Sequence, residues 1–415
     1  MFLKLYKVLS LIFSFPIFLY FIIRLLTSKE KINSLLEKFS IRQKERPRGK
    51  IIWINGVSIG EAKTGIIIAE QIKKKSPNTT VLFSTSTLTA YKLISDLSKN
   101  LILVYSPLDI SFIVRRFIRH WKPESTIFIE SEIWPNIFSC LKKNSVRLTL
   151  VNARISKKSY SNWKKLKFFS KELFELIDEC YAQDQDSAKR FEALGVKKIR
   201  RIGNLKFLSE KLNYNSLNYK KLKKQLKNKR VVTIFSSHEG DEEIFINCQR
   251  TLSKKINNLF FIIIPRHIHR TQKIKNDLMR GKKSFLLRTK DKLIIKDREF
   301  LVVDTFGELG LFFKLSEIAV VGGSFSNIGG HNPIETNDFN CSVVFGPHMQ
   351  NFKDVKKKIL TYKAGFEVQD SDQLTKRLYE NLNNRSLNNK SIRNFRELCR
   401  VEYKKSKLIL KSLIK

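Results

Sequence analysis

Acidic side chains follow two apolar segments in the first half of the chain. Glu61 comes shortly after the apolar segment Ile51–Ile54, beyond a glycine-containing loop, and it opens the next amphipathic stretch. A carboxylate at the mouth of a strand is suited to general base catalysis, although an acid in a first helical turn also serves as a partner of the helix dipole. Glu130 and Glu132 directly follow a second apolar segment, where charge is costly unless it is solvated or paired. The pattern favours acid–base or hydroxyl-binding chemistry, with helix capping as the alternative.

Basic residues and a histidine occupy similar places further along the chain. Arg266 follows a strongly apolar run, and a guanidinium there suits a phosphate or a carboxylate. Lys206 precedes a polar, basic stretch and can face a ligand, but in a chain with 79 Lys and Arg a single lysine is most often a solvated surface residue. His238 lies beside several acids, a pattern that we interpret as helix capping rather than as a metal site.

The most informative segment is Val320–Glu335, which reads as a strand, a double-glycine loop and a helix that starts at Pro333. The free amides of such a turn form an anion site, and Glu335 can accept hydrogen bonds from ribose hydroxyls. Neither a G-x-G-x-x-G fingerprint nor a P-loop is present, which disfavours a dehydrogenase and an NTPase. Gly307, in a further strand–loop–helix segment, allows backbone amides to approach a ligand closely.

Short apolar runs alternate with amphipathic stretches throughout the chain, which predicts parallel sheets covered by helices. The predicted strands are Ile51–Ile54, Val81–Ser84, Leu101–Tyr105, Ile127–Ile129, Leu148–Val151, Cys180–Ala182, Val231–Phe235, Phe260–Ile264, Leu301–Val303, Ile318–Val321 and Val343–Phe345. A length of 415 residues fits two α/β domains. We predict an N-terminal anchor at 1–28, a first domain at 29–208, a linker at 209–229, a second domain at 230–390 and a C-terminal helix at 391–415. Since ligands of open α/β sheets lie beyond the carboxyl ends of the strands, the candidate residues are well placed.

The charge of the chain indicates its partners rather than its fold. With 79 Lys and Arg against 38 Asp and Glu, the formal net charge is +41, which suits nucleic acid, an anionic membrane or phosphorylated substrates. A nucleic-acid binder is the less favoured alternative, because no RNA- or DNA-binding motif with interleaved aromatic residues is found. The five cysteines are widely spaced and form no C-x-x-C pair, a pattern typical of reduced thiols rather than of disulfides or a zinc site.

The N-terminal run Val8–Ile23 carries no charge and is marginally long enough to cross a membrane. Pro16 is expected to kink it. No A-x-A-like site follows, which disfavours a cleaved signal peptide. Lysines and arginines flank the run, mostly on its C-terminal side, which predicts that the main body lies in the cytoplasm, held at an anionic inner-membrane surface. A buried helix of the first domain is the alternative.

Taken in order, these segments resemble the 3-deoxy-D-manno-octulosonic acid (Kdo) transferase family of lipopolysaccharide biosynthesis in Gram-negative bacteria. The resemblance runs from about residue 52 to residue 352 and rests on VSIGE, ESEIWPN, VNARIS, GNLKF, SSHEG, PRH, DTFGELG, VGGSFSNIGGHNPIE and FGPHMQNF. It implies a GT-B fold, in which two Rossmann-like domains face a cleft. The first domain then takes a phosphorylated lipid A precursor (lipid IVA type) and the second takes CMP-Kdo, with inversion and with neither a metal ion nor a cofactor. Another GT-B transferase that uses a UDP- or GDP-sugar is the alternative.

The resemblance also assigns roles to individual residues. Glu61 matches the general base of the family, and Glu130 and Lys206 match residues that stabilise the transition state. The CMP-binding positions of the family fall on Pro265, Arg266, Phe306, Gly307, Glu308, Asn332, Pro333, Ile334 and Glu335. Three features depart from the family pattern: Phe306 replaces a usual Met, Ser84–Ala90 lacks a Gly near its end, and Asn55–Gly56 replaces a His-Ala type pair. The first is a tolerated apolar change, whereas the other two put the shape of the loop and of the acceptor pocket in question.

Overall fold

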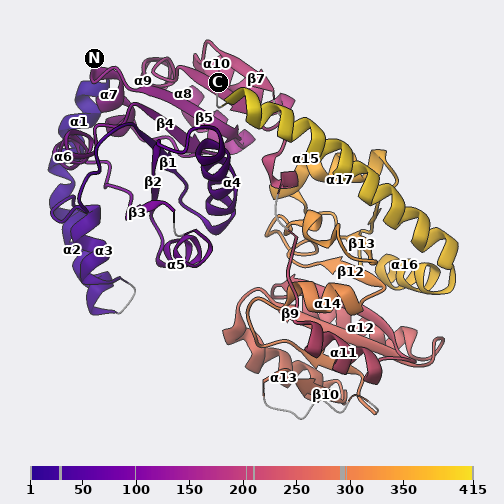
Figure 1. Ribbon diagram of the computed structural model, residues 1–415. Coiled ribbons are helices and arrows are strands. Elements are labelled where there is room, and N and C mark those ends of the chain that lie inside the picture. Colours follow the sequence, from indigo (N-terminus) through magenta and orange to yellow (C-terminus); the bar gives the residue numbers. More distant parts are fainter. Residues whose placement is uncertain are drawn as a thin grey trace. The chain divides into compact units, whose positions relative to one another are not determined.

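The computed structural model describes residues 2–27, 30–98, 100–201, 203–208, 211–289, 295 and 297–413. The chain divides into two compact units (Figure 1). Unit 1 comprises Met1–Ser209 and Glu402–Lys415, and unit 2 comprises Glu210–Val401. Each unit is built around a parallel seven-stranded sheet, so the prediction of two parallel-sheet α/β domains is confirmed.

The sheet of unit 1 has the strand order β3-β2-β1-β4-β5-β6-β7. Its strands are β1 (Ile51–Asn55), β2 (Thr80–Thr85), β3 (Ile102–Tyr105), β4 (Ser125–Ile129), β5 (Arg147–Ala153), β6 (Glu179–Ala182) and β7 (Ile199–Arg201). Its helices after the first strand are α4 (Ile59–Lys75), α5 (Leu88–Leu97), α6 (Ser111–Trp121), α7 (Pro135–Lys143), α8 (Lys157–Lys165), α9 (Lys167–Phe174), α10 (Gln185–Leu194) and the 3-10 turn η1 (Leu205–Leu208).

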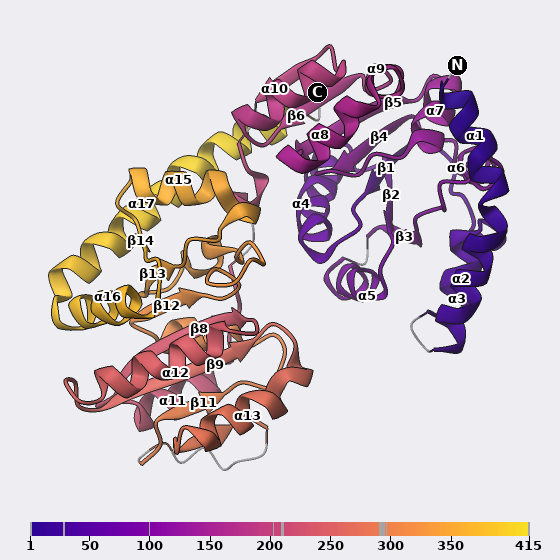
Figure 2. The ribbon, with the colours of Figure 1, turned by 180° about the vertical axis from the view of Figure 1, so that it is seen from behind.

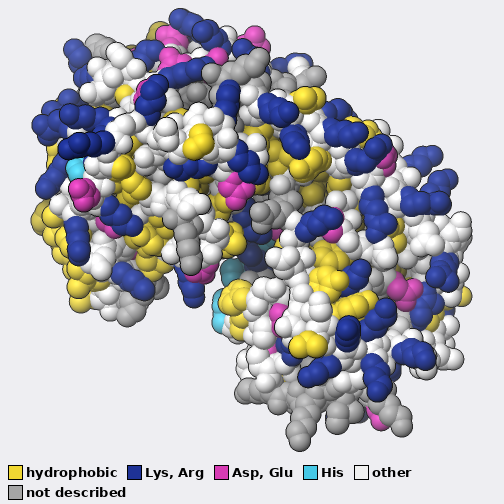
Figure 3. Space-filling view, in the orientation of Figure 1, with side chains coloured by type: hydrophobic (Ala, Val, Ile, Leu, Met, Phe, Trp, Pro, Cys, Tyr) yellow, Lys and Arg dark blue, Asp and Glu magenta, His cyan; other side chains and the backbone are white. Residues whose placement is uncertain are grey.

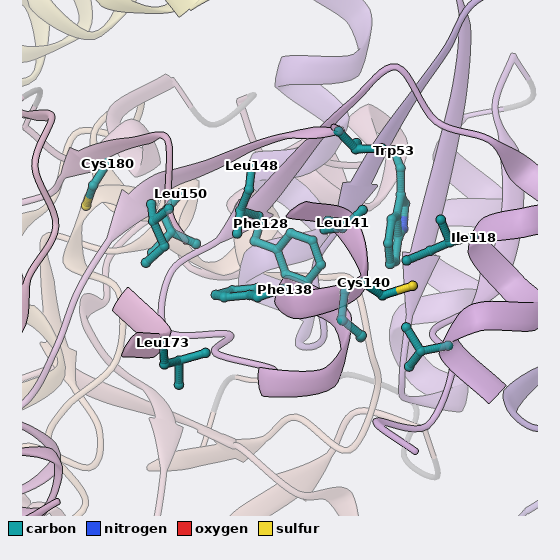
Figure 4. Close-up of a cluster of buried hydrophobic side chains, with 14 of the residues drawn as sticks. Trp53, Ile118, Phe128, Phe138, Cys140, Leu141, Leu148, Leu150, Leu173 and Cys180 are labelled. Carbon is teal, nitrogen blue, oxygen red and sulfur yellow. The ribbon is translucent and has the colours of Figure 1, made fainter. Parts of the chain in front are cut away.

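Helices cover both faces of this sheet, because its strands are apolar on both sides. Trp53 points to the face covered by α6, α7, α9 and α10, where it packs with Phe128 and Phe138 in the cluster shown in Figure 4. The next residue, Ile54, points to the opposite face, which α4 and α5 cover. This two-sided burial is typical of parallel sheets.

The N-terminal helices belong to unit 1, where the first of them packs against α6, α7 and α9. They are α1 (Phe2–Ile12), α2 (Ser14–Leu26) and α3 (Ile32–Lys38). The Tyr6 hydroxyl donates to Asp109, and Asn136 donates to Ser10, so polar contacts fasten α1 to the loop before α6 and to α7. No single helix in the described ranges has both the length and the apolar composition to cross a membrane; α1 and α2 meet these criteria only as a pair bent by 48°. The bend lies just ahead of Pro16, whose ring clashes with the carbonyl group four residues earlier, as the predicted kink requires.

Unit 2 repeats the plan with the strand order β10-β11-β9-β8-β12-β13-β14. Its strands are β8 (Arg230–Ser237), β9 (Leu259–Pro265), β10 (Phe285–Leu287), β11 (Phe300–Val302), β12 (Ile318–Val321), β13 (Ser342–Phe345) and β14 (Phe366–Glu367). Its helices are α11 (Ser216–Gln225), α12 (Asp241–Leu252), η2 (Ile268–Arg270), α13 (Thr271–Arg280), α14 (Leu309–Leu315), η3 (Pro333–Thr336), η4 (Gln350–Phe352), α15 (Lys353–Thr361), α16 (Ser371–Asn383) and α17 (Arg385–Leu413). Figure 2 shows α12 and α13 on the near side of this sheet.

The predicted strands all form, with limits that shift by one or two residues. Two boundaries differ more. The stretch predicted as a linker at 209–229 contains α11, which belongs to unit 2 and packs on α14. The C-terminal helix begins at Arg385 rather than at 391, and its residues from Glu402 onward group with unit 1. None of the five cysteines, all of which are described, forms a disulfide.

Candidate active site

Several candidate residues lie at the switch point of each sheet, where the strand order reverses. In unit 1 this point falls between β1 and β4, which precede Glu61 and Glu130. In unit 2 it falls between β8 and β12, which precede His238 and the double glycine Gly322–Gly323. Ligands of open α/β sheets bind at this kind of position. The topology therefore gives each unit one candidate ligand-binding position.

Glu61 sits in the first turn of α4 and is 8% exposed. One of its oxygens accepts from the Val57 amide at 2.7 Å, and the other accepts from the Ser58 hydroxyl at 3.0 Å. Ser58 in turn caps the helix, so the capping role considered from the sequence is present. Burial, and then the charge of Glu130, raises the pKa of Glu61 against these hydrogen bonds. A buried carboxylate with a raised pKa is also what a general base requires.

Glu130 and Lys206 form an ion pair of 2.8 Å, with side chains only 14% and 15% exposed. The alternative of a solvated surface lysine is therefore wrong for Lys206. Glu130 adopts a left-handed backbone conformation with φ 61°, which is uncommon for a residue with a Cβ atom. Unit 1 thus brings together the three residues that the resemblance assigns to catalysis.

Two further residues complete this cluster. The side chain of Asn152 is fully buried; it accepts from the Leu205 amide at 3.0 Å and donates to Glu130 at 3.4 Å. It therefore holds the turn that carries Lys206 beside Glu130. The sequence offered only the motif VNARIS as a signal for Asn152. Glu132 accepts from the Trp134 indole at 2.8 Å, and burial, followed by the charge of Glu61, raises its pKa to about 7.

In unit 2 a buried carboxylate fastens the double-glycine loop. Asp241, which is fully buried, accepts from the His238 amide at 2.8 Å and from the Gly323 amide at 2.6 Å. In the sequence, Asp241 is only one of the several acids beside His238. A Cβ atom at Gly322 would lie 2.4 Å from the carbonyl oxygen of Ser236, so the loop approaches β8 as only glycine allows.

A pair of histidines and Arg266 lie beside this loop. The Nε2 atoms of His238 and His331 are 2.8 Å apart, so one imidazole donates to the other, and the planes of the two rings are parallel within 2°. Burial and nearby positive charge, including that of Arg266, lower the pKa of both, to about 3 for His331. Both rings are therefore neutral at pH 7. The Arg266 amide donates to the Ser237 carbonyl, and the Arg266 side chain is exposed.

The remaining predicted donor residues fall in two loops. Phe306 is 80% exposed at the carboxyl end of β11, and Gly307 has φ 82°. Glu308 is held by Arg288 at 2.7 and 3.0 Å and accepts from Thr305, so its carboxylate is already partnered.

After the double glycine, the Asn332 side chain accepts from the Ile334 amide and caps η3. The element that starts at Pro333 is a single 3-10 turn rather than the expected helix, which leaves fewer free amides for an anion. Pro265, Pro333 and Ile334 are buried, whereas Glu335 is partly exposed.

The two parallel-sheet units have the plan of the GT-B fold. HepE of Anabaena, solved in complex with UDP, superposes with a TM-score of 0.60 at 12% identity, over 88% of this chain and 99% of that one. A glycosyltransferase from Rickettsia africae gives 0.59 at 12% identity, over 89% and 100%. At such identities the likeness shows the fold alone.

The amino-acid sequence identifies the family to which the chain belongs. Residues 33–209 match the family model described as 3-deoxy-D-manno-octulosonic-acid transferase (kdotransferase). The 3-deoxy-D-manno-octulosonic acid transferase of Rickettsia bellii is 33% identical over 95% of this chain and 94% of its own length. That of Haemophilus influenzae is 31% identical over 81% and 80%. The chain belongs to the Kdo transferase family.

Proposed function

We propose that this protein transfers Kdo from CMP-Kdo to a hydroxyl group of a phosphorylated lipid A precursor of the lipid IVA type. The observation that carries the proposal is the cluster of Glu61, Glu130 and Lys206, three residues from distant parts of the sequence that meet at the switch point of unit 1. Family membership supports Kdo as the transferred sugar.

The chemistry follows from these groups. Glu61 takes the proton of the acceptor hydroxyl, and the oxygen bonds to the anomeric carbon of Kdo while the bond from that carbon to the phosphate oxygen breaks. CMP leaves from the opposite face, so the configuration inverts. Charge builds up on the departing phosphate, where Arg266 and the backbone amides near Asn332 stabilise it. The Lys206–Glu130 pair stabilises the transition state on the acceptor side. The protein itself supplies the positive charge, and the proposed reaction uses no metal ion.

The surface of α1 and α2 supports a place at the cytoplasmic side of the inner membrane. Neither helix has a buried residue, and large apolar side chains such as Phe15, Ile23 and Leu26 are exposed. Figure 3 shows hydrophobic side chains gathered over these helices, with Lys and Arg beside them. An apolar strip with basic neighbours suits an anionic lipid surface.

The test is incubation of the protein with CMP-Kdo and a tetraacylated lipid A precursor, with products identified by mass. The expected product is heavier than the precursor by one or more Kdo residues, and its anomeric configuration is opposite to that of the donor. Thermal protection by CMP, compared with UDP and GDP, tests the donor separately. Stronger protection by UDP or GDP would favour another GT-B transferase.

A further inference from the structure

Unit 1 contains a cavity of about 790 Å³ that the proposed catalytic cluster does not use. It lies between α3, the segment 42–44 and α5. The side chains on which the following argument depends are Lys31, Arg42, Lys44, Lys92, Tyr91 and Tyr105.

The cavity opens at the same edge of the sheet as the catalytic cluster. Its wall includes Tyr105, the last residue of β3, and the first turn of α5, which follows β2. The strands β3, β2 and β1 are parallel neighbours, so their carboxyl ends meet at one edge. The hydroxyls of Thr85 and Thr87 donate to the Val57 carbonyl, which ties the loop after β2 to the loop that holds Glu61. A ligand in the cavity therefore lies on the side of unit 1 where the acceptor hydroxyl must be.

One wall of the cavity is a built cationic and aromatic surface. The ammonium group of Lys44 donates to the Leu103 carbonyl at 2.7 Å and lies over the Tyr91 ring. Tyr91 stacks on Tyr105, with ring centroids 4.5 Å apart. These contacts fix Lys44 in place, so its charge is presented without a further loss of side-chain freedom.

The other cations leave the cavity positively charged. Lys31, Arg42 and Lys92 are exposed and line it together with Lys44, against two acids, Glu37 and Asp96. Glu37 already accepts the Tyr105 amide at 2.9 Å. Four cations against two acids favour an anion with several oxygens, and phosphate is the anion that Lys and Arg bind most readily in this way.

The surroundings of the cavity are apolar. The α3 wall is followed by Phe39, which packs edge-on against Phe18 and Phe21 of α2. Ile32 and Ile41, next to Lys31 and Arg42 in the chain, are 62% and 55% exposed. A phosphate site bordered by apolar side chains fits an amphiphile whose acyl chains lie on α2. We propose that this cavity binds a phosphate group of the acceptor glycolipid, an inference that rests on the proposed function.

The test compares two variants with matched changes of charge. Lys31→Gln/Arg42→Gln/Lys92→Gln removes three of the four cations that line the cavity and keeps Lys44. Lys74→Gln/Lys143→Gln/Lys197→Gln, the control, removes three exposed lysines at the opposite edge of the sheet. The tetraacylated bisphosphorylated disaccharide lipid, its dephosphorylated form, phosphatidylglycerol and inorganic phosphate are the probes, measured in detergent micelles without donor.

The cavity variant is expected to bind the bisphosphorylated lipid about tenfold or more weakly, with a matching rise in KM and an unchanged kcat. The control should bind as the native protein does, and the dephosphorylated lipid should bind all three proteins equally. Inorganic phosphate should compete weakly. If the native protein bound phosphatidylglycerol as tightly as the bisphosphorylated lipid, the assignment of the cavity to the acceptor would be overturned. Equal affinities of the cavity variant and the control variant for the bisphosphorylated lipid would overturn it too. A native protein that transfers no Kdo would instead refute the proposed function itself.

Discussion

Replacing Glu61 by glutamine separates the structural role of this side chain from its chemical one. Glutamine keeps the shape and can still accept a hydrogen bond from the Val57 amide or the Ser58 hydroxyl. Because burial raises the pKa of Glu61 in the folded protein, its stabilising contribution is complete below the unfolded pKa and is lost as the pH rises through the folded pKa. The glutamine side chain of the variant does not ionise, so the variant does not lose this stability as the pH rises. We expect Glu61→Gln to unfold at or above the native midpoint at neutral pH, and its advantage to shrink at pH 4.

The rate of Kdo transfer by Glu61→Gln should fall, although the stability of this variant should not. A positioned general base contributes about 10²–10⁴-fold, so the variant should lose about 2.7–5.4 kcal/mol of transition-state stabilisation. The assay is the initial rate of Kdo transfer, combined with thermal unfolding of the same preparation. Glu61→Ala is the contrast, because it also removes the capping bonds and should cost about 1 kcal/mol of stability. If folded Glu61→Gln transfers Kdo at the native rate, Glu61 is only a helix cap and the mechanism is wrong.

Four further predictions concern Glu132, Lys206, Arg266 and the independence of the reaction from metal ions. Burial and the charge of Glu61 raise the pKa of Glu132 to about 7, so the pH profile of kcat should contain an ionisation near pH 7 that Glu132→Gln lacks; identical profiles would exclude this. Lys206→Met leaves Glu130 partly buried without its cation and should cost about 1–3 kcal/mol in urea unfolding, part of which Glu130→Gln in the same chain restores; a native midpoint for the single variant would contradict the pairing. Arg266→Gln should raise the KM for CMP-Kdo about tenfold and weaken thermal protection by CMP, whereas unchanged protection would remove Arg266 from the donor site. Treatment with EDTA should leave the rate unchanged, and a loss restored by a divalent cation would disprove metal-independent transfer.

The fold was predictable because its core strands are short apolar runs whose type does not depend on distant contacts. Ten such runs lie in the interior of the two sheets and were found within one or two residues. The strands β7, β10 and β14 were not predicted, since two or three residues at a sheet edge carry no readable periodicity. The segment 209–229 was misjudged because a polar, basic stretch looks alike in a linker and in an exposed helix such as α11.

The site was predictable as a set of positions but not as a set of contacts. Glu61 was found because it follows a strand and a short glycine-containing loop, and Glu130 because it follows a strand directly. Lys206 was named as a candidate, but its ion pair with Glu130 was not predicted, because the turn that carries Lys206 is held by Asn152, whose bond to the Leu205 amide spans 53 residues. Asp241 is one of several acids beside His238 in the sequence. Its role in holding the double-glycine loop was missed, because its bond to the Gly323 amide spans 82 residues. A single sequence contains no local signal for bonds of that range.

Asn152 and Asp241 also explain how each unit holds an unfavourable loop. Glu130 and Asn152 both have φ above 50°, a conformation that costs about 1–2 kcal/mol for each residue with a Cβ atom. In unit 1 the buried amide of Asn152 links the strained turn to η1, and in unit 2 the buried carboxylate of Asp241 links the double-glycine loop to the loop after β8. In both cases a fully buried polar side chain joins two loops that emerge from different strands near the switch point. Since an unpaired buried polar group is costly, each bridge stabilises one loop geometry over its alternatives. Each bridge thereby brings residues that are far apart in the sequence within bonding distance of one another.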